Sequence, residues 1–152
     1  MKIAIGCDDA AIALKETIKI LLVELGHEVE DYGVYTPEPS LYPDTAVKVC
    51  EGVLAGDQER GILICGTGIG MAIAANKVPG IRAAVCHDLF STQRSIRSND
   101  CQIMTLGERV IGPELAKELV KVWLECDFAG GGSAAKVEKI MEYEQKFIRG
   151  GK

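Results

Sequence analysis

The stretch ICGTGIGMAIAANK, residues 64–77, places a cysteine where an apolar run stops and follows it with three glycines. Glycines let main-chain N–H groups come close to a ligand, and a following helix adds partial positive charge at its amino end. Such a loop can hold a developing oxyanion, and the same field lowers the pKa of a nearby thiol. The spacing therefore predicts that Cys65 acts as a thiolate, either as a nucleophile or as a base toward carbon.

Other uses of this glycine loop are less consistent with the sequence. A dinucleotide site needs GxGxxG after the first strand, whereas this chain has GxGxG after the third, and GxxxxGK[ST] is absent. A purely structural turn remains an alternative. A nucleophilic cysteine usually needs a histidine, and of His27 and His87 only His87 is placed for that role. His87 next to Asp88 could equally be a helix-capping pair.

The elements around the loop alternate between short apolar runs and longer amphipathic ones. Strands are predicted over residues 2–8, 28–33, 61–66, 81–88 and 101–107, and helices over a run ending at Gly26 and over 45–56, 70–77, a polar segment through Arg97, 112–125 and 136–147. We expect Asp44 to cap the second helix. Five strand–helix alternations predict a single α/β domain over 1–152, a Rossmann-like, doubly wound five-stranded parallel sheet with helices on both faces and a C-terminal helix.

The strand order sets where a ligand binds. In the common order 2-1-3-4-5, the crevice lies at the carboxyl ends of strands 1 and 3, where the order reverses. Strand 1 ends near Asp8 and strand 3 ends at Cys65. We therefore expect these two residues to face each other across the crevice.

Composition narrows the class of partner and compartment. The chain has 152 residues, is 47% hydrophobic and carries a net charge of −5, which argues against nucleic acid or an anionic membrane as partner. It shows neither a membrane span nor the pattern of a signal peptide. Its six cysteines form no CxxC pair and several lie in apolar runs, so reduced thiols in the cytoplasm are expected.

Several blocks together resemble one enzyme family. They are IGCD at 5–8, YPDTA at 42–46, GILICGTGIGMAIAANKVPGIRAA at 61–84, ND at 99–100, LGERVIGPELAKELV at 106–120 and VEKI at 137–140. Over nearly its whole length the chain is similar to ribose-5-phosphate isomerase B and the galactose-6-phosphate isomerase subunits. The resemblance implies an aldose–ketose isomerase of a sugar phosphate that works through an enediol without metal or organic cofactor.

The resemblance also implies roles for individual residues. Cys65 looks like the base and Thr67 like its partner in moving protons between oxygens. The cradle for the enediolate oxygen would comprise Gly66, Gly68, Ile69, Gly70 and Asn99, and the hydroxyl ligands Asp8 and Tyr42. Family members are dimers or tetramers with shared sites, so Arg109 and residues 132–136 would serve a neighbour's site in a homodimer or homotetramer.

The chain departs from the ribose-5-phosphate isomerase pattern at ligand positions. Asp9 and Ser98 stand where histidines are usual, Gly132 replaces an arginine, and Lys136 replaces a second arginine. Because the histidine at position 98 is associated with opening the sugar ring, its absence favours an open-chain tetrulose such as D-erythrulose 4-phosphate over the family default, D-ribose 5-phosphate. We keep Asp9, Ser98 and Lys136 as candidate substrate ligands.

The same departures leave three alternatives. The reduced positive charge weakens a phosphate site, so an unphosphorylated sugar is one alternative substrate. A non-catalytic subunit of a hetero-oligomeric isomerase is another, although the intact Cys65 and Thr67 argue against it. A nucleotide-binding module is the third, and the missing fingerprints argue against that.

Overall fold

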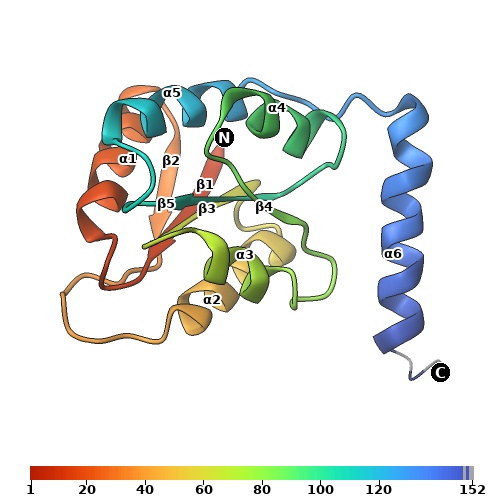
Figure 1. Cartoon of the computed structure of the whole chain (residues 1–152), viewed down its shortest axis with the longest axis horizontal. Coiled ribbons are helices and arrows are strands. Elements are labelled where there is room, and N and C mark those ends of the chain that lie inside the picture. Colours follow the sequence, from red (N-terminus) through yellow and green to blue (C-terminus); the bar gives the residue numbers. More distant parts are fainter. Residues whose placement is uncertain (149, 151–152) are drawn as a thin grey trace.

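The computed structural model describes residues 1–148 and residue 150. A five-stranded, all-parallel sheet forms its centre, with strands β1 Lys2–Cys7, β2 Glu28–Asp31, β3 Arg60–Cys65, β4 Ala83–Val85 and β5 Ile103–Gly107. Helices α1 Ile12–Glu24, α4 Leu89–Arg97 and α5 Pro113–Leu124 cover one face, and α2 Tyr42–Ala55 and α3 Ile69–Ala75 cover the other (Figure 1). The predicted parallel sheet with helices on both faces is confirmed.

The strand order is β2-β1-β3-β5-β4, so the last two strands are exchanged relative to the predicted order. Strand β5 is buried along its whole length and pairs with β3 on one side and β4 on the other. Strand β4 has three residues, all half-buried, which suits the edge of a sheet. The reversal between β1 and β3, on which the predicted crevice depends, is unaffected.

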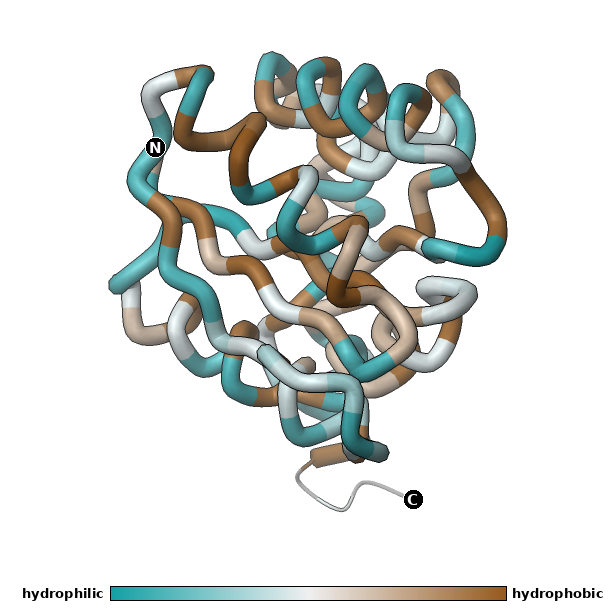
Figure 2. The backbone as a smooth tube through the Cα atoms, turned by 90° about the vertical axis from the view of Figure 1, so that its left-hand side faces the viewer, coloured by the Kyte–Doolittle hydropathy of each residue, from teal (hydrophilic) through white to brown (hydrophobic). Residues whose placement is uncertain are grey.

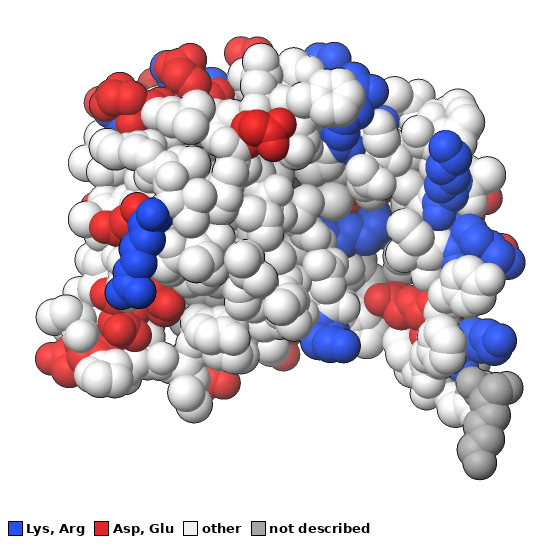
Figure 3. Space-filling model, in the orientation of Figure 1, with Lys and Arg blue, Asp and Glu red and all other residues white. Residues whose placement is uncertain are grey.

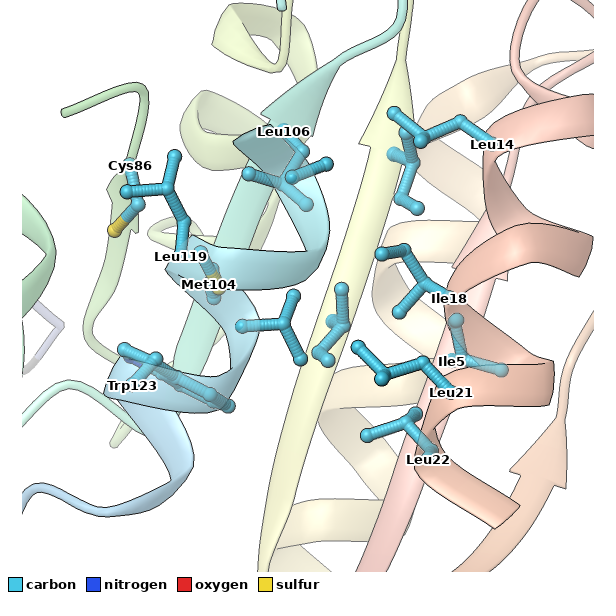
Figure 4. Close-up of a cluster of buried hydrophobic side chains, with 14 of the residues drawn as sticks. Ile5, Leu14, Ile18, Leu21, Leu22, Cys86, Met104, Leu106, Leu119 and Trp123 are labelled. Carbon is cyan, nitrogen blue, oxygen red and sulfur yellow. The ribbon is translucent and has the colours of Figure 1, made fainter. Parts of the chain in front are cut away.

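The sheet is buried on both faces, as continuous apolar strands require. The larger core packs α1, α4 and α5 against the sheet and contains the fully buried Trp123 and Met104 (Figure 4). The smaller core packs α2 and α3 and contains Leu63 and Met71. In Figure 2 the central strands are mostly hydrophobic while the helices alternate along their length. All six cysteines are buried and unbridged, as expected.

The helix α6, Ala134–Ile148, stands apart from the rest of the chain (Figure 1). It follows a short 3₁₀ turn, Gly131–Ser133, and within its bounds only Val137 is buried. A groove of about 680 Å³ separates α6 from the body, lined among others by Arg82, Asp100 and Met141, and the gap is visible in Figure 3. Over the described part of the chain, no helix is both long and apolar enough to cross a membrane.

The start of α2 differs from the prediction. The helix begins at Tyr42, with Pro43 in its first turn and Leu41 at the N-cap, so Asp44 lies inside the first turn and is not the cap. Because the first N–H groups of a helix have no partner within the helix, proline is tolerated at that position. The helix therefore starts a few residues earlier than predicted. This early start places Tyr42 beside the glycine loop after β3.

Candidate active site

The loop after β3 wraps its main chain around the Cys65 sulfur. Cys65 is buried at the end of β3, and its Sγ accepts a hydrogen bond from the Gly68 N–H at 3.1 Å. Gly68 has a φ of 75°, which only glycine adopts readily, and a Cβ there would lie 3.0 Å from the carbonyl carbon of Leu106. Helix α3 begins at the next residue and has no side-chain cap. Glycine is therefore required both for the backbone turn and for the close contact with β5.

Strand β5 and the loop after it hold the glycine loop in place. The Thr105 hydroxyl donates to the Gly68 carbonyl at 2.8 Å. The Glu108 N–H donates to the Cys65 carbonyl at 2.9 Å, and the Arg109 N–H donates to the Gly66 carbonyl at 3.0 Å. These three bonds fix the carbonyls of the loop from the β5 side. The Gly68 N–H donates to the Cys65 sulfur and the Ile69 N–H donates to the exposed Thr67 hydroxyl at 3.3 Å.

Two long side chains flank this loop. The Tyr42 ring lies against Gly70, where a Cβ would come within 2.6 Å of the tyrosine Cζ. The Arg109 side chain lies along Gly66, where a Cβ would be 3.5 Å from the arginine Cδ. Both side chains are exposed at the carboxyl edge of the sheet. A bulkier residue at position 70 would displace the tyrosine.

Asp8 and Asp9 leave β1 at the same edge but have different surroundings. Asp8 is half-buried, and burial raises the pKa of its carboxyl while the Ala10 N–H and Arg109 oppose that rise. Asp9 is bound to Ser40, whose N–H and hydroxyl both donate to Asp9 Oδ1, at 2.9 and 2.8 Å. These bonds lower the pKa of Asp9. The geometry leaves Asp8 available to a ligand and uses Asp9 to hold the loop before α2.

Three of the predicted ligands lie elsewhere in the chain. Ser98 and Asn99 follow the carboxyl end of α4 and precede β5, so they lie at the amino edge of the sheet. The five residues of β5 separate that edge from the Cys65 edge by about 17 Å. The Asn99 carbonyl accepts from Arg82, and Lys136 lies on α6, exposed. A single chain does not bring these residues to Cys65.

His87 and Asp88 each accept a hydrogen bond from a main-chain N–H group. Asp88 caps α4 by accepting from the Ser91 N–H at 2.8 Å, so the capping prediction is confirmed for the aspartate. His87 Nε2 accepts from the Gly107 N–H at 2.9 Å, and this contact was not foreseen. Ser40 was also missed, because nothing in the local pattern links residue 40 to residue 9.

These features define a class of protein before any comparison. The fold is an α/β sheet of the Rossmann-like kind, and its strand order reverses between β1 and β3, whose carboxyl ends are the usual place for a ligand in such sheets. A thiol, a hydroxyl, a carboxyl and a guanidinium meet there beside the main chain of the glycine loop. This combination is suited to acid–base chemistry on a small oxygen-rich molecule.

Known proteins place the chain more narrowly. The family model described as Ribose/Galactose Isomerase matches residues 3–140. A D-erythrulose-4-phosphate isomerase of Pectobacterium atrosepticum is 55% identical over 96% of this chain and 97% of its own length, and a ribose-5-P isomerase B of Listeria innocua is 53% identical over 96% and 99%. The ribose-5-phosphate isomerase B structure from Clostridium thermocellum superposes with a TM-score of 0.95 at 49% identity, covering 97% and 99% of the two chains.

The chain belongs to the ribose/galactose isomerase family. The predicted family and the predicted enzyme class, an aldose–ketose isomerase, are thereby confirmed. The Pectobacterium and Listeria relatives bear the names of enzymes for two different sugar phosphates, one with four carbons and one with five.

Proposed function

We propose that the protein interconverts an aldose and a ketose phosphate through an enediolate, with Cys65 as the base. The observation that carries this proposal is the Gly68 N–H donating to Cys65 Sγ at the head of the glycine loop. The donor faces the sulfur lone pairs, the arrangement that a thiolate needs. No histidine is required beside it.

The proton transfers of the proposed reaction use two side chains, those of Cys65 and Thr67. Cys65 removes a proton from the carbon next to the carbonyl, and the electron pair of that C–H bond forms the C=C bond of the enediolate while the carbonyl oxygen takes the charge. The amides of Gly66, Thr67 and Gly70, which are not the donors to Cys65 Sγ and Thr67 Oγ1, stabilise that oxygen. The Thr67 hydroxyl relays a proton between the two oxygens, and the Cys65 thiol returns its proton to the neighbouring carbon. Asp8 and Tyr42 bind hydroxyls of the sugar.

We propose D-erythrulose 4-phosphate, in equilibrium with D-erythrose 4-phosphate, as the substrate pair. A tetrulose phosphorylated on its terminal oxygen cannot close a five-membered ring through that oxygen, so no ring-opening group is needed. Ser98 stands where a ring-opening histidine is usual, and Asp9, which is bound to Ser40, stands where a second histidine is usual. Their absence is consistent with a substrate that has no ring to open. The name of the Pectobacterium relative supports this choice. D-Ribose 5-phosphate is the second candidate, supported by the Listeria relative and the C. thermocellum structure.

We propose that the working site is shared between two chains of a homodimer in the cytoplasm. Asn99 and Lys136 lie away from the Cys65 loop of their own chain, and α6 presents exposed Ile140, Tyr143 and Phe147. A second chain that covers α6 also brings a second amino edge close to the first chain's site. Arg109 and Lys136 then supply the positive charge for the phosphate.

The first experiment follows each sugar phosphate in D₂O by NMR, with Cys65→Ala as the inactive control. Turnover and C–H exchange of the tetrulose alone support the first substrate. Turnover of ribose 5-phosphate at a comparable rate overturns that choice but leaves the reaction class intact. Exchange that persists in Cys65→Ala removes the proposed base.

A second experiment asks whether position 98 selects the substrate. Ser98→His restores a ring-opening group, and we expect it to raise kcat/KM on ribose 5-phosphate relative to the tetrulose. Arg97→His, one position earlier on an exposed site, is the matched control. An equal change in both variants would argue against a role for residue 98.

Mixing two inactive variants tests the shared site. Cys65→Ala chains keep Asn99, and Asn99→Ala chains keep Cys65, so only a mixed dimer contains one intact site. Random exchange then restores about a quarter of the sites of the unmodified enzyme. Activity that does not recover after exchange, although sedimentation shows dimers, would contradict the shared site. Asn99 would then act in the same chain as Cys65 or lie outside the site.

A further inference from the structure

His87 takes over a hydrogen bond at the point where the β4–β5 ladder ends. The Cys86 N–H still donates to the Thr105 carbonyl at 3.0 Å, but the next N–H on β5, that of Gly107, finds the His87 imidazole instead of a β4 carbonyl. A main-chain N–H can only donate, so Nε2 must be the unprotonated nitrogen. The ring is therefore neutral, with its proton on Nδ1.

Gly107 is the residue where β5 touches the glycine loop most closely. A Cβ at position 107 would lie 2.7 Å from Cα and from the carbonyl carbon of Thr67, so the two main chains are packed against each other. The two residues after Gly107 donate their N–H groups to the Cys65 and Gly66 carbonyls. Gly107 thus connects the imidazole of an edge strand with the loop that carries the base.

We propose that His87 is a positioning residue, which in its neutral form fixes Gly107 and through it holds Thr67 and the glycine loop in the geometry for enediolate formation. It is not the proton partner of Cys65. Its Nε2 is occupied by the Gly107 N–H, and the Cys65 sulfur is occupied by the Gly68 N–H. The effect on catalysis rests on the proposed isomerase function, whereas the contact itself does not.

The surroundings of His87 favour the neutral ring. Burial lowers the pKa of His87, and the opposing effect of the Asp88 carboxylate, which accepts from the Ser91 N–H, is smaller. Helix α3 and strand β5 carry no titratable side chain. The remaining charges nearby are engaged elsewhere: Arg94 stacks on Phe90, Arg97 lies at the far end of α4, Glu108 accepts from the Leu14 N–H, and Arg109 lies along Gly66.

Protonation would reverse the contact. A protonated imidazole has donors at both nitrogens, so Nε2–H would face the Gly107 N–H and the bond would be lost. Gly107 would then lose the bond that fixes it against Thr67, while the bonds from Thr105, Glu108 and Arg109 to the loop carbonyls remain. Activity should fall at acid pH for a reason that does not involve the substrate's own titration.

The contact is tested first without substrate, by ¹⁵N NMR of the histidine rings and of the Gly107 amide. The chain has only two histidines, so His27→Gln assigns the remaining ring. We expect an Nδ1–H tautomer for His87, and a Gly107 amide shift that titrates with the His87 ring. A Nε2–H tautomer, or a Gly107 amide that ignores the ring's titration, would overturn the proposal whether or not a substrate is known.

Two variants then test the effect on catalysis. His87→Gln keeps an acceptor at about the reach of Nε2 and does not titrate, whereas His87→Phe keeps a ring and removes the acceptor. We expect His87→Phe to lower kcat about ten- to a hundredfold with little change in KM. We expect His87→Gln to stay within about threefold and to lose the part of the acid limb that the unmodified enzyme shows.

The outcomes separate this proposal from the proposed function. Equal kcat and equal pH profiles in the unmodified enzyme and His87→Phe would overturn the positioning role. An unchanged acid limb in His87→Gln would assign that limb to the phosphate or to another group, and would overturn the titration argument. If neither sugar phosphate is turned over, the proposed function fails, and the tautomer and the Gly107 titration still decide the contact.

Discussion

The carboxyl edge of β3 and β5 makes many contacts within its own chain, whereas the helix α6 makes few. At the edge, Thr105, Glu108 and Arg109 each bind a carbonyl of the glycine loop, and Gly107 packs on Thr67. On α6, one residue is buried while Ile140, Tyr143 and Phe147 are exposed. The chain therefore organises the proton-transfer side of the proposed site by itself. Ser98, Asn99 and Lys136 lie away from that edge, and in the proposed dimer a second chain supplies them.

The largest expected effect is on the packing that supports the carboxyl edge. Lys15 is fully buried and binds Asp31 and the Val34 carbonyl, so Lys15→Met leaves Asp31 with Lys19 and the Gly33 N–H. Burial alone would lower the pKa of Lys15, yet its bonds to Asp31 and Glu16 raise it. We expect Lys15→Met to lower the free energy of unfolding by about 3 kcal/mol, measured by urea titration.

Lys19→Met is the matched control, because Lys19 binds the same carboxylate from a side chain that is 36% exposed. We expect a loss of about 1 kcal/mol or less. Equal losses in the two variants would mean that burial of Lys15 does not matter, and that the edge is less tightly supported than the structure indicates.

The next effect is on the loop contact itself. Gly107→Ala puts a methyl group into the Thr67 main chain, and we expect kcat/KM to fall about a hundredfold because the loop must move. Gly112→Ala, a few residues later in the same connection, meets no atom within 4 Å and should leave the activity unchanged. Activity retained in Gly107→Ala would show that the loop tolerates displacement. The carboxyl edge would then not be fixed by its own chain more firmly than α6 is.

The α6 side is tested by adding a charge to its exposed face. Ile140 is 50% exposed in the single chain, and Ile140→Asp would place a carboxylate in the proposed contact between chains. We expect the dimer to weaken by about 2 kcal/mol, roughly thirtyfold in dissociation constant, measured by sedimentation. Activity should fall with the dimer fraction, and the melting profile at high concentration should change little. An unaltered dimer would place the interface elsewhere.

The smallest effect is the dependence of stability on pH near the His87 contact. The pKa of His87 in the fold lies below the ordinary value of 6.5, so the unfolded chain binds a proton first as pH falls. The stabilisation is complete above about pH 6.5 and is lost as pH falls through the folded pKa, with a slope of at most about 1.4 kcal/mol per pH unit. Urea titrations of the unmodified protein, His87→Gln and His27→Gln measure it, and the last variant gives the separate contribution of His27, whose pKa is also lowered by burial. An identical slope in all three would exclude a contribution from His87.

Most of the fold was predictable because its signals are local. Apolar runs of strand length and amphipathic runs of helix length predicted every strand and helix to within a few residues. The exchange of β4 and β5 was not predictable, since pairing depends on which strand can be buried on both sides, and no local pattern records that. The start of α2 was misjudged because Asp44 was expected to be the cap of a helix from residue 45, although Pro43 is well suited to the first turn of a helix.

The candidate site was predictable where its residues belong to one loop. Cys65, Thr67 and the glycines follow one another in sequence. The pairing of β3 with β5 adds only the residues that hydrogen-bond to the loop carbonyls. The Asp9–Ser40 and His87–Gly107 contacts join residues that are far apart in the chain, so no spacing could indicate them. The grouping of Ser98, Asn99 and Lys136 with Cys65 came from resemblance, and the single chain keeps them apart.

The sequence alone determined the alternation of strands and helices, the thiol at the end of an apolar strand and the glycines that follow it, because these depend on side-chain type and short-range sterics. It also carried the family relationship through long continuous blocks. The tertiary structure decided which strand lies beside β3, which N–H groups face the sulfur and the loop carbonyls, and which nitrogen of His87 faces the Gly107 N–H. These depend on distances between segments that only packing sets.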